Sequence, residues 1–78
     1  MTFEEMQKII SDSVGVEKEL IKPDTKLKED LGADSLDLFQ IVVYVEDKYD
    51  IQMPEDEIEK IVTAQDALDE ANRLLGKG

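Results

Sequence analysis

The amino-acid sequence predicts an all-α fold: a small four-helix bundle with three main helices, a short third helix, and a long loop between helices 1 and 2. Two observations carry this prediction. Apolar residues recur at spacings of three and four in separate segments, and a capping residue precedes each main segment. A chain of 78 residues without cysteine is expected to fold as one small domain, residues 1–78, without disulfides.

The first helix is predicted to follow Thr2, because Thr2 and Glu5 form a capping-box pattern. Gly15 is expected to end it. Residues 15–34 then show no sustained period, and Pro23 disfavours a continuous helix. We expect a packed loop with a short helical turn. The first helix is lined by Phe3, Met6, Ile10 and Val14, and the loop anchors are expected to be Val16, Leu20, Ile21, Leu27 and Leu31.

The second helix is predicted to open at Asp34-Ser35 and to run for about fifteen residues. Its β-branched run, residues 41–45, would suit a strand on propensity alone. The length, the cap and the lack of a partner strand favour a helix. The expected inward stripe is Leu38, Ile41, Val42, Val45 and Tyr49, and a second stripe holds Leu36, Phe39 and Val43.

Two further helices are expected in the last third of the chain. Pro54 begins a short one that ends near Ile61, with three acids in its first turn, where the helix dipole favours them. Thr63 and Asp66 cap the last helix, and Gly76 can end it. The residues expected to line this helix are Ala67, Leu68, Ala71, Leu74 and Leu75.

The composition argues against catalysis by the chain itself. There is no cysteine and no histidine, which removes the thiolate nucleophile, the usual general base and the commonest transition-metal ligand. We therefore expect a protein that is not an enzyme and has no metal site. The net charge of −11 disfavours nucleic acid and anionic membranes as partners. No apolar run is long enough to insert into a membrane, and the first residues lack a basic start, so a cytoplasmic protein is expected.

The negative charge is concentrated in the middle of the chain. Residues 29–59 hold eleven acids and one base, Lys48. A charged run alone is commonly a solvated face that keeps a protein soluble. Here the acids surround the start of the second helix, which also carries the apolar pair Leu36 and Val43. We interpret this combination as a docking surface for a basic partner.

Ser35 is the candidate functional residue. It falls in the first turn of the second helix, so its hydroxyl is expected near solvent, unpaired backbone N–H groups and the positive end of the helix dipole. A phosphate attached there would be stabilised. The alternative is that Asp34 or Ser35 is only a helix cap. Ser35 is a poor catalytic nucleophile because no histidine is available to activate it.

The string from Glu29 to Asp37 (EDLGADSLD) closely resembles the modification-site signature of bacterial acyl carrier proteins. Residues 13–16, 46–54 and 60–67 are similar to other parts of that family in the same order. The resemblance implies that Ser35 carries 4′-phosphopantetheine, obtained from coenzyme A and joined through a phosphodiester. Asp34 and Leu36 flank the attachment site, and the thiol of the arm holds acyl groups as thioesters.

The resemblance also assigns roles to two further sets of residues. Residues that would bind partner enzymes are Asp34, Leu36, Asp37, Phe39, Val43, Glu46, Asp47 and Met53. Residues that would form the core and a cleft for the acyl chain are Leu31, Ile41, Val45, Tyr49, Ile58, Ile61, Ala67 and Leu68. The resemblance also implies a place in the core for Leu27, Met53 and Ala71.

The partners implied by the resemblance are the enzymes of dissociated (type II) fatty acid synthesis. They are a phosphopantetheinyl transferase (holo-acyl-carrier-protein synthase), malonyl transferase, ketoacyl synthases, reductases, a dehydratase and acyltransferases, and the carrier itself is expected to be a monomer. Two alternatives stay open: a polyketide-type or other specialised carrier, and, more remotely, an unmodified acidic helical interaction module. Gln40, Phe39, Tyr44 and Val43 depart from the residues usual in fatty-acid carriers, which leaves partner identity open.

Overall fold

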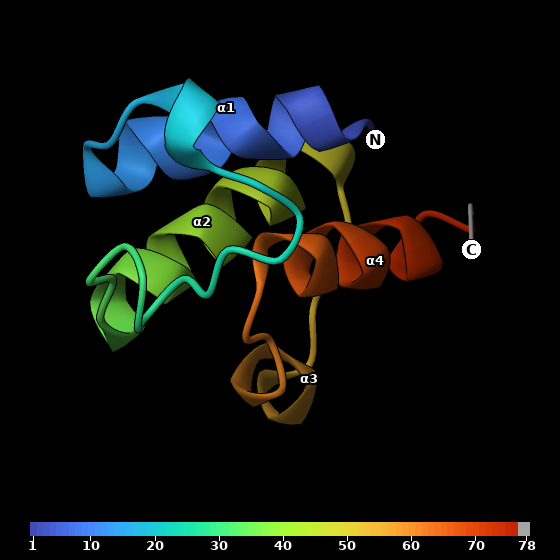
Figure 1. Ribbon diagram of the computed structural model, residues 1–78. Helices are drawn as coiled ribbons and strands as arrows, with labels where there is room; N and C mark the ends of the chain where they lie inside the picture. The colour runs from blue at the N-terminus through green and yellow to red at the C-terminus, as the bar shows by residue number, and fades with distance from the viewer. Residues whose placement is uncertain (77–78) are drawn as a thin grey trace.

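The computed structural model describes residues 1–76. Four α-helices and one short 3₁₀ helix follow one another along the chain, so the predicted all-α bundle is confirmed. Figure 1 shows α1 lying across α2, α4 beside them, and the short α3 at the opposite side from α1. The elements are α1 (Phe3–Val14), η1 (Lys18–Leu20), α2 (Ser35–Tyr49), α3 (Glu55–Glu59) and α4 (Ala64–Leu74).

Capping boxes start all three main helices. Thr2 accepts the Glu5 N–H at 3.2 Å, and Thr63 accepts the Asp66 N–H at 3.0 Å, as the sequence predicts. At α2 the cap is Asp34. The third helix ends two residues before the predicted Ile61, because the N–H groups of Lys60 and Ile61 turn back to the carbonyls of Glu57 and Ile58 at 3.1 Å.

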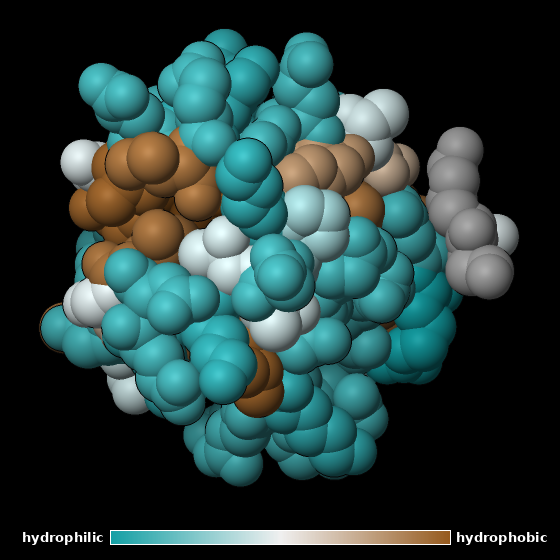
Figure 2. Space-filling model, viewed as in Figure 1, coloured by the Kyte–Doolittle hydropathy of each residue, from teal (hydrophilic) through white to brown (hydrophobic). Residues whose placement is uncertain are grey.

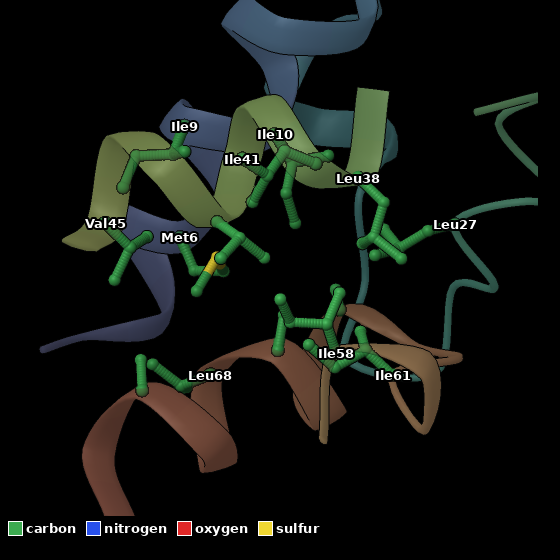
Figure 3. Packing of buried hydrophobic residues seen from close by; sticks show 14 of the residues in the cluster. Met6, Ile9, Ile10, Leu27, Leu38, Ile41, Val45, Ile58, Ile61 and Leu68 are labelled. Carbon is green, nitrogen blue, oxygen red and sulfur yellow. The ribbon is translucent and has the colours of Figure 1, made fainter. Parts of the chain in front are cut away.

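A single hydrophobic core lies between α1, α2 and the α3–α4 region. In Figure 3, Met6, Ile10, Ile41 and Val45 gather on one side of this core, and Leu68 lies across from them. The least exposed large side chains in the described part of the chain are those of Met6, Ile10, Ile21, Leu27, Ile41 and Val45.

The remaining surface is mostly hydrophilic. In Figure 2 the largest hydrophobic area lies between α1 and the N-terminal part of α2, on a face that is otherwise largely polar. Leu20 was expected to be a loop anchor, but this prediction is wrong, because 62% of its surface is exposed. Among the helices of residues 1–76, none combines the length and hydrophobicity needed to cross a membrane.

Backbone hydrogen bonds fasten the long loop to the link between α3 and α4. The Leu27 N–H donates to the Val62 carbonyl at 2.9 Å, and the Ala64 N–H donates to the Thr25 carbonyl at 3.0 Å. These bonds flank an antiparallel bridge between Lys26 and Thr63. The loop between α1 and α2 is therefore held in place along much of its length, as a loop that presents a functional residue must be.

Glu5 connects α1 to the end of α2. Its carboxylate accepts a hydrogen bond from the Tyr49 hydroxyl and forms an ion pair with the Lys48 ammonium group at 3.2 Å. The Tyr49 hydrogen bond, followed by that from Lys48, lowers the pKa of Glu5 below its ordinary value near 4.5. A carboxylate with a lowered pKa in the folded state stabilises the protein above its unfolded pKa, and this contribution disappears as the pH falls through the folded pKa.

Tyr49→Phe removes the main cause of this pKa shift. We expect the variant to unfold at lower urea concentration than the parent at about pH 7. The difference should shrink as the pH falls from the ordinary carboxyl pKa near 4.5 through the lowered pKa of Glu5 in the parent, below which Glu5 is protonated in both proteins. The measurement is urea unfolding across a pH series. Tyr44→Phe is the matched control, because 53% of Tyr44 is exposed. A stability difference that is constant over the whole series would contradict this account.

Candidate functional site

Ser35 is the first residue of α2, and its side chain is exposed. Asp34 precedes it as the cap: its carboxylate accepts the Asp37 N–H at 3.0 Å, and the Asp37 carboxylate accepts the Asp34 N–H at 3.2 Å. This reciprocal pair satisfies two backbone donors at the helix start. The alternative in which Ser35 is the cap is therefore excluded, and its hydroxyl is not used for capping.

The chain approaches Ser35 through a tight, anchored turn. Gly32 adopts a left-handed conformation with φ of 70°, which glycine tolerates readily. Ala33 follows; it is buried, and its N–H donates to the Leu27 carbonyl at 3.1 Å. With Ala33 buried before it and Leu38 buried after it, the intervening turn is exposed and holds Ser35 at a fixed position on the surface.

Next to Ser35, α2 carries a shallow apolar depression. Leu36, Phe39 and Val43 are 72%, 41% and 51% exposed, which agrees with a second stripe outside the core. The depression has a volume of about 410 Å³, and Asp47 lies at its acidic edge. Gln40 and Tyr44, which the sequence marks only as departures from the family pattern, also line the depression. The full lining is Leu36, Phe39, Gln40, Val43, Tyr44 and Asp47.

Two residues predicted to bind partners occupy different surroundings from those expected. Met53, which was expected both in the core and among the partner-binding residues, is only 7% exposed and belongs to the core, so its side chain does not lie on the partner-facing surface. Its neighbours Gln52 and Pro54 are exposed instead. Glu46 is half-buried, and its carboxylate accepts the Met53 N–H at 2.7 Å. Asp34, Asp47 and all three residues of the apolar stripe are exposed, while Asp37 is half-buried.

The residues predicted to line an acyl cleft lie together. Six of them form part of the core at exposures of 7% or less, and in Figure 3 Ile58 and Ile61 lie close together in this core. Leu31 and Tyr49 are half-buried at its margin. The core between α2, α3 and α4 is therefore continuous and apolar. The six core residues are Ile41, Val45, Ile58, Ile61, Ala67 and Leu68.

Two acids outside this surface, Asp66 and Glu70, stabilise α4 through hydrogen bonds. Two backbone N–H groups, from Val62 and Thr63, each reach the Asp66 carboxylate at 3.0 Å. The Thr63 bond is the largest cause of the lowered pKa of Asp66. The Arg73 guanidinium forms a bidentate ion pair with the Glu70 carboxylate, with N–O distances of 2.8 and 2.6 Å, and this pair lowers the pKa of Glu70. Across residues 1–76, no three acidic side chains are grouped in a way that could hold a metal ion.

Asp34→Ala removes the cap directly before Ser35. We expect it to destabilise the fold by about 1 kcal/mol, because the Asp37 N–H loses its acceptor. Thermal and urea unfolding measure the loss, with Asp24→Ala as a control that removes the same charge from an exposed position outside the helices. Asp34→Asn should retain most of the stability, since an amide oxygen also caps. Equal stability of Asp34→Ala and Asp24→Ala would show that the cap contributes nothing.

Comparisons with known proteins agree with this geometry. A family model described as "Phosphopantetheine attachment site" matches residues 4–70. A curated acyl carrier protein of Chlorobium phaeobacteroides is 44% identical over 66 residues, which is 85% of each chain. The crystal structure of an acyl carrier protein from Thermotoga maritima superposes with a TM-score of 0.80 at 29% identity, over 94% of this chain and 85% of the other. The solution structure of the acetyl actinorhodin acyl carrier protein from Streptomyces coelicolor superposes with a TM-score of 0.79 at 26% identity, over 99% of this chain and 93% of the other.

Proposed function

The chain belongs to the phosphopantetheine-attachment family, in which it is an acyl carrier and not an enzyme, and we propose that Ser35 is the residue that bears its 4′-phosphopantetheine. The observation that carries the proposal is the exposure of Ser35 beside the Asp34–Asp37 cap. Of the three serines, Ser11 donates its hydroxyl to the Val16 carbonyl and Ser13 is half-buried, so Ser35 is the accessible one.

The start of α2 fits a phosphodiester. Ser35 and Leu36 occupy the first two helical positions, whose N–H groups lie outside the α-helical hydrogen-bond ladder and beside the positive end of the dipole. The turn at Gly32 leaves open space, because a Cβ placed there would meet nothing within 4 Å. When bound, the arm supplies the thiol that the sequence lacks and holds the acyl group as a thioester. The chain itself presents that arm at a fixed point.

The acidic and apolar surface of α2 supports docking by basic enzymes. Asp34 and Asp47 lie toward opposite ends of the helix, and the apolar depression lies between them. Acids around a small apolar patch favour fast association with a positively charged surface and fast release. The family works with transferases and synthesis enzymes. We assign this carrier to the cytoplasm, as a monomer that serves type II fatty acid synthesis through the transferases, synthases, reductases and dehydratase named above.

A polyketide-type or other specialised carrier is the second candidate. It is favoured by the bulk that Phe39 and Tyr44 bring to the depression, since this changes the shape that a partner must match. The apolar core between α2, α3 and α4 serves either role, because it gives the acyl chain a place away from water.

Intact mass spectrometry tests the attachment site. After incubation with coenzyme A and a broad-specificity phosphopantetheinyl transferase, we expect the parent to gain the mass of one phosphopantetheine and Ser35→Ala to gain none. Ser13→Ala is the matched control, and it should be modified like the parent. Modification of Ser35→Ala would move the site to another residue. No gain in the folded parent would favour the unmodified acidic interaction module.

The double substitution Phe39→Val and Val43→Met tests the depression. We expect it to change the turnover of acyl groups by the carrier's own synthase enzymes, because both side chains line the surface that a partner contacts. Leu20→Met is a control that alters an exposed apolar side chain outside the depression. Unchanged rates with every partner enzyme would remove these two positions from the recognition surface.

A further inference from the structure

Glu46 accepts three hydrogen bonds from the segment that joins α2 to α3. Its backbone carbonyl accepts the N–H groups of Asp50 and Ile51, the latter at 3.2 Å. Its carboxylate accepts the Met53 N–H at 2.7 Å. Hydrogen bonds from an N–H to a carboxylate are among the stronger ones in proteins, so this contact fixes the path of the segment.

Met53 links this backbone contact to the core, because its N–H is bound by Glu46 and its side chain is buried. Its side chain is 7% exposed and packs in the same cluster as Ile58 of α3. Pro54, the next residue, begins α3, and its carbonyl accepts the Glu57 and Ile58 N–H groups at 3.0 Å. A shift of the Met53 backbone would therefore move both the buried Met53 side chain and the start of α3.

Glu46 also lies next to the docking surface. It follows Val43 of the apolar depression by three residues, so the two side chains are neighbours on the helix surface. The Glu46 side chain is half-buried, so part of it is open to solvent. A long lysine or arginine side chain of a partner seated against Val43 and Asp47 would reach the exposed part of the Glu46 side chain. A cation competes well with a neutral backbone N–H for a carboxylate, because the charged pair is stronger.

We propose that Glu46 is a positioning residue that couples partner docking to the opening of the apolar core. In the free carrier it holds the Met53 N–H and keeps the wall formed by Met53 and α3 closed. A lysine or arginine of a docked enzyme takes the carboxylate, the α2–α3 segment loosens, and a buried acyl chain can leave. This inference rests on the proposed function for its biological role, whereas the contact between Glu46 and Met53 can be tested without it.

The first test is amide hydrogen exchange of Met53 in the unmodified protein. We expect Glu46→Ala to speed exchange at Met53 by about tenfold or more, because the N–H loses its acceptor. Glu46→Gln keeps a carbonyl acceptor and should retain most of the protection. Asp47→Asn removes a neighbouring exposed charge and should leave this amide unchanged. Unchanged exchange in Glu46→Ala would overturn the proposal, whether or not Ser35 is modified.

The second test separates positioning from simple docking by chain length. The carrier is loaded with an acetyl or an octanoyl group, and transfer to a ketoacyl synthase is followed at saturating enzyme. We expect Glu46→Gln to slow octanoyl transfer by about tenfold, since the neutral amide stays on Met53, and to change acetyl transfer less than twofold. Asp47→Asn should raise the enzyme concentration needed for both groups alike. Equal effects of Glu46→Gln on both chain lengths, or no effect on either, would overturn the proposal.

Discussion

The position of Ser35 depends on the hydrogen bonds between the long loop and the link from α3 to α4. The two central bonds run from the Leu27 N–H to the Val62 carbonyl at 2.9 Å and from the Ala64 N–H to the Thr25 carbonyl at 3.0 Å. Without them, the second half of this loop of about twenty residues would lose its main backbone ties to the rest of the bundle, and the approach to α2 would be held less firmly. With them, the turn at Gly32 follows a buried, anchored segment, and the exposed serine is held at a defined place on a rigid helix.

The bundle combines three long helices, α1, α2 and α4, with the short helix α3, which can loosen more easily. α1, α2 and α4 are long, capped helices that share a core, and Glu5 ties α1 to Tyr49. α3 has five residues and no side-chain cap. Short, weakly capped elements open more easily than long ones. A carrier needs this division, because the attachment site has to stay in place while the apolar interior admits and releases a chain.

The sequence predicted the features that depend on local patterns. The capping residues, the spacing of apolar residues and the position of Ser35 are local, and the structure agrees with them. Leu20 was predicted wrongly: it is exposed although it is apolar, since a loop has no period that assigns each side chain to a face. Met53 was expected both in the core and among the partner-binding residues, and only the folded chain shows that its side chain is buried. Contacts between residues distant in sequence, such as the bridge from Lys26 to Thr63, leave no local pattern to read.

The most direct test of this account compares amide hydrogen exchange at the loop with exchange in α3. The N–H groups of Leu27 and Ala64 hold the long loop against the link between α3 and α4, whereas the N–H group of Ile58 lies in α3 and donates to the Pro54 carbonyl. We expect the amide protons of Leu27 and Ala64 to exchange much more slowly than that of Ile58 under native conditions. Faster exchange at Leu27 and Ala64 than at Ile58 would contradict it, because the loop that positions Ser35 would then open before the wall does.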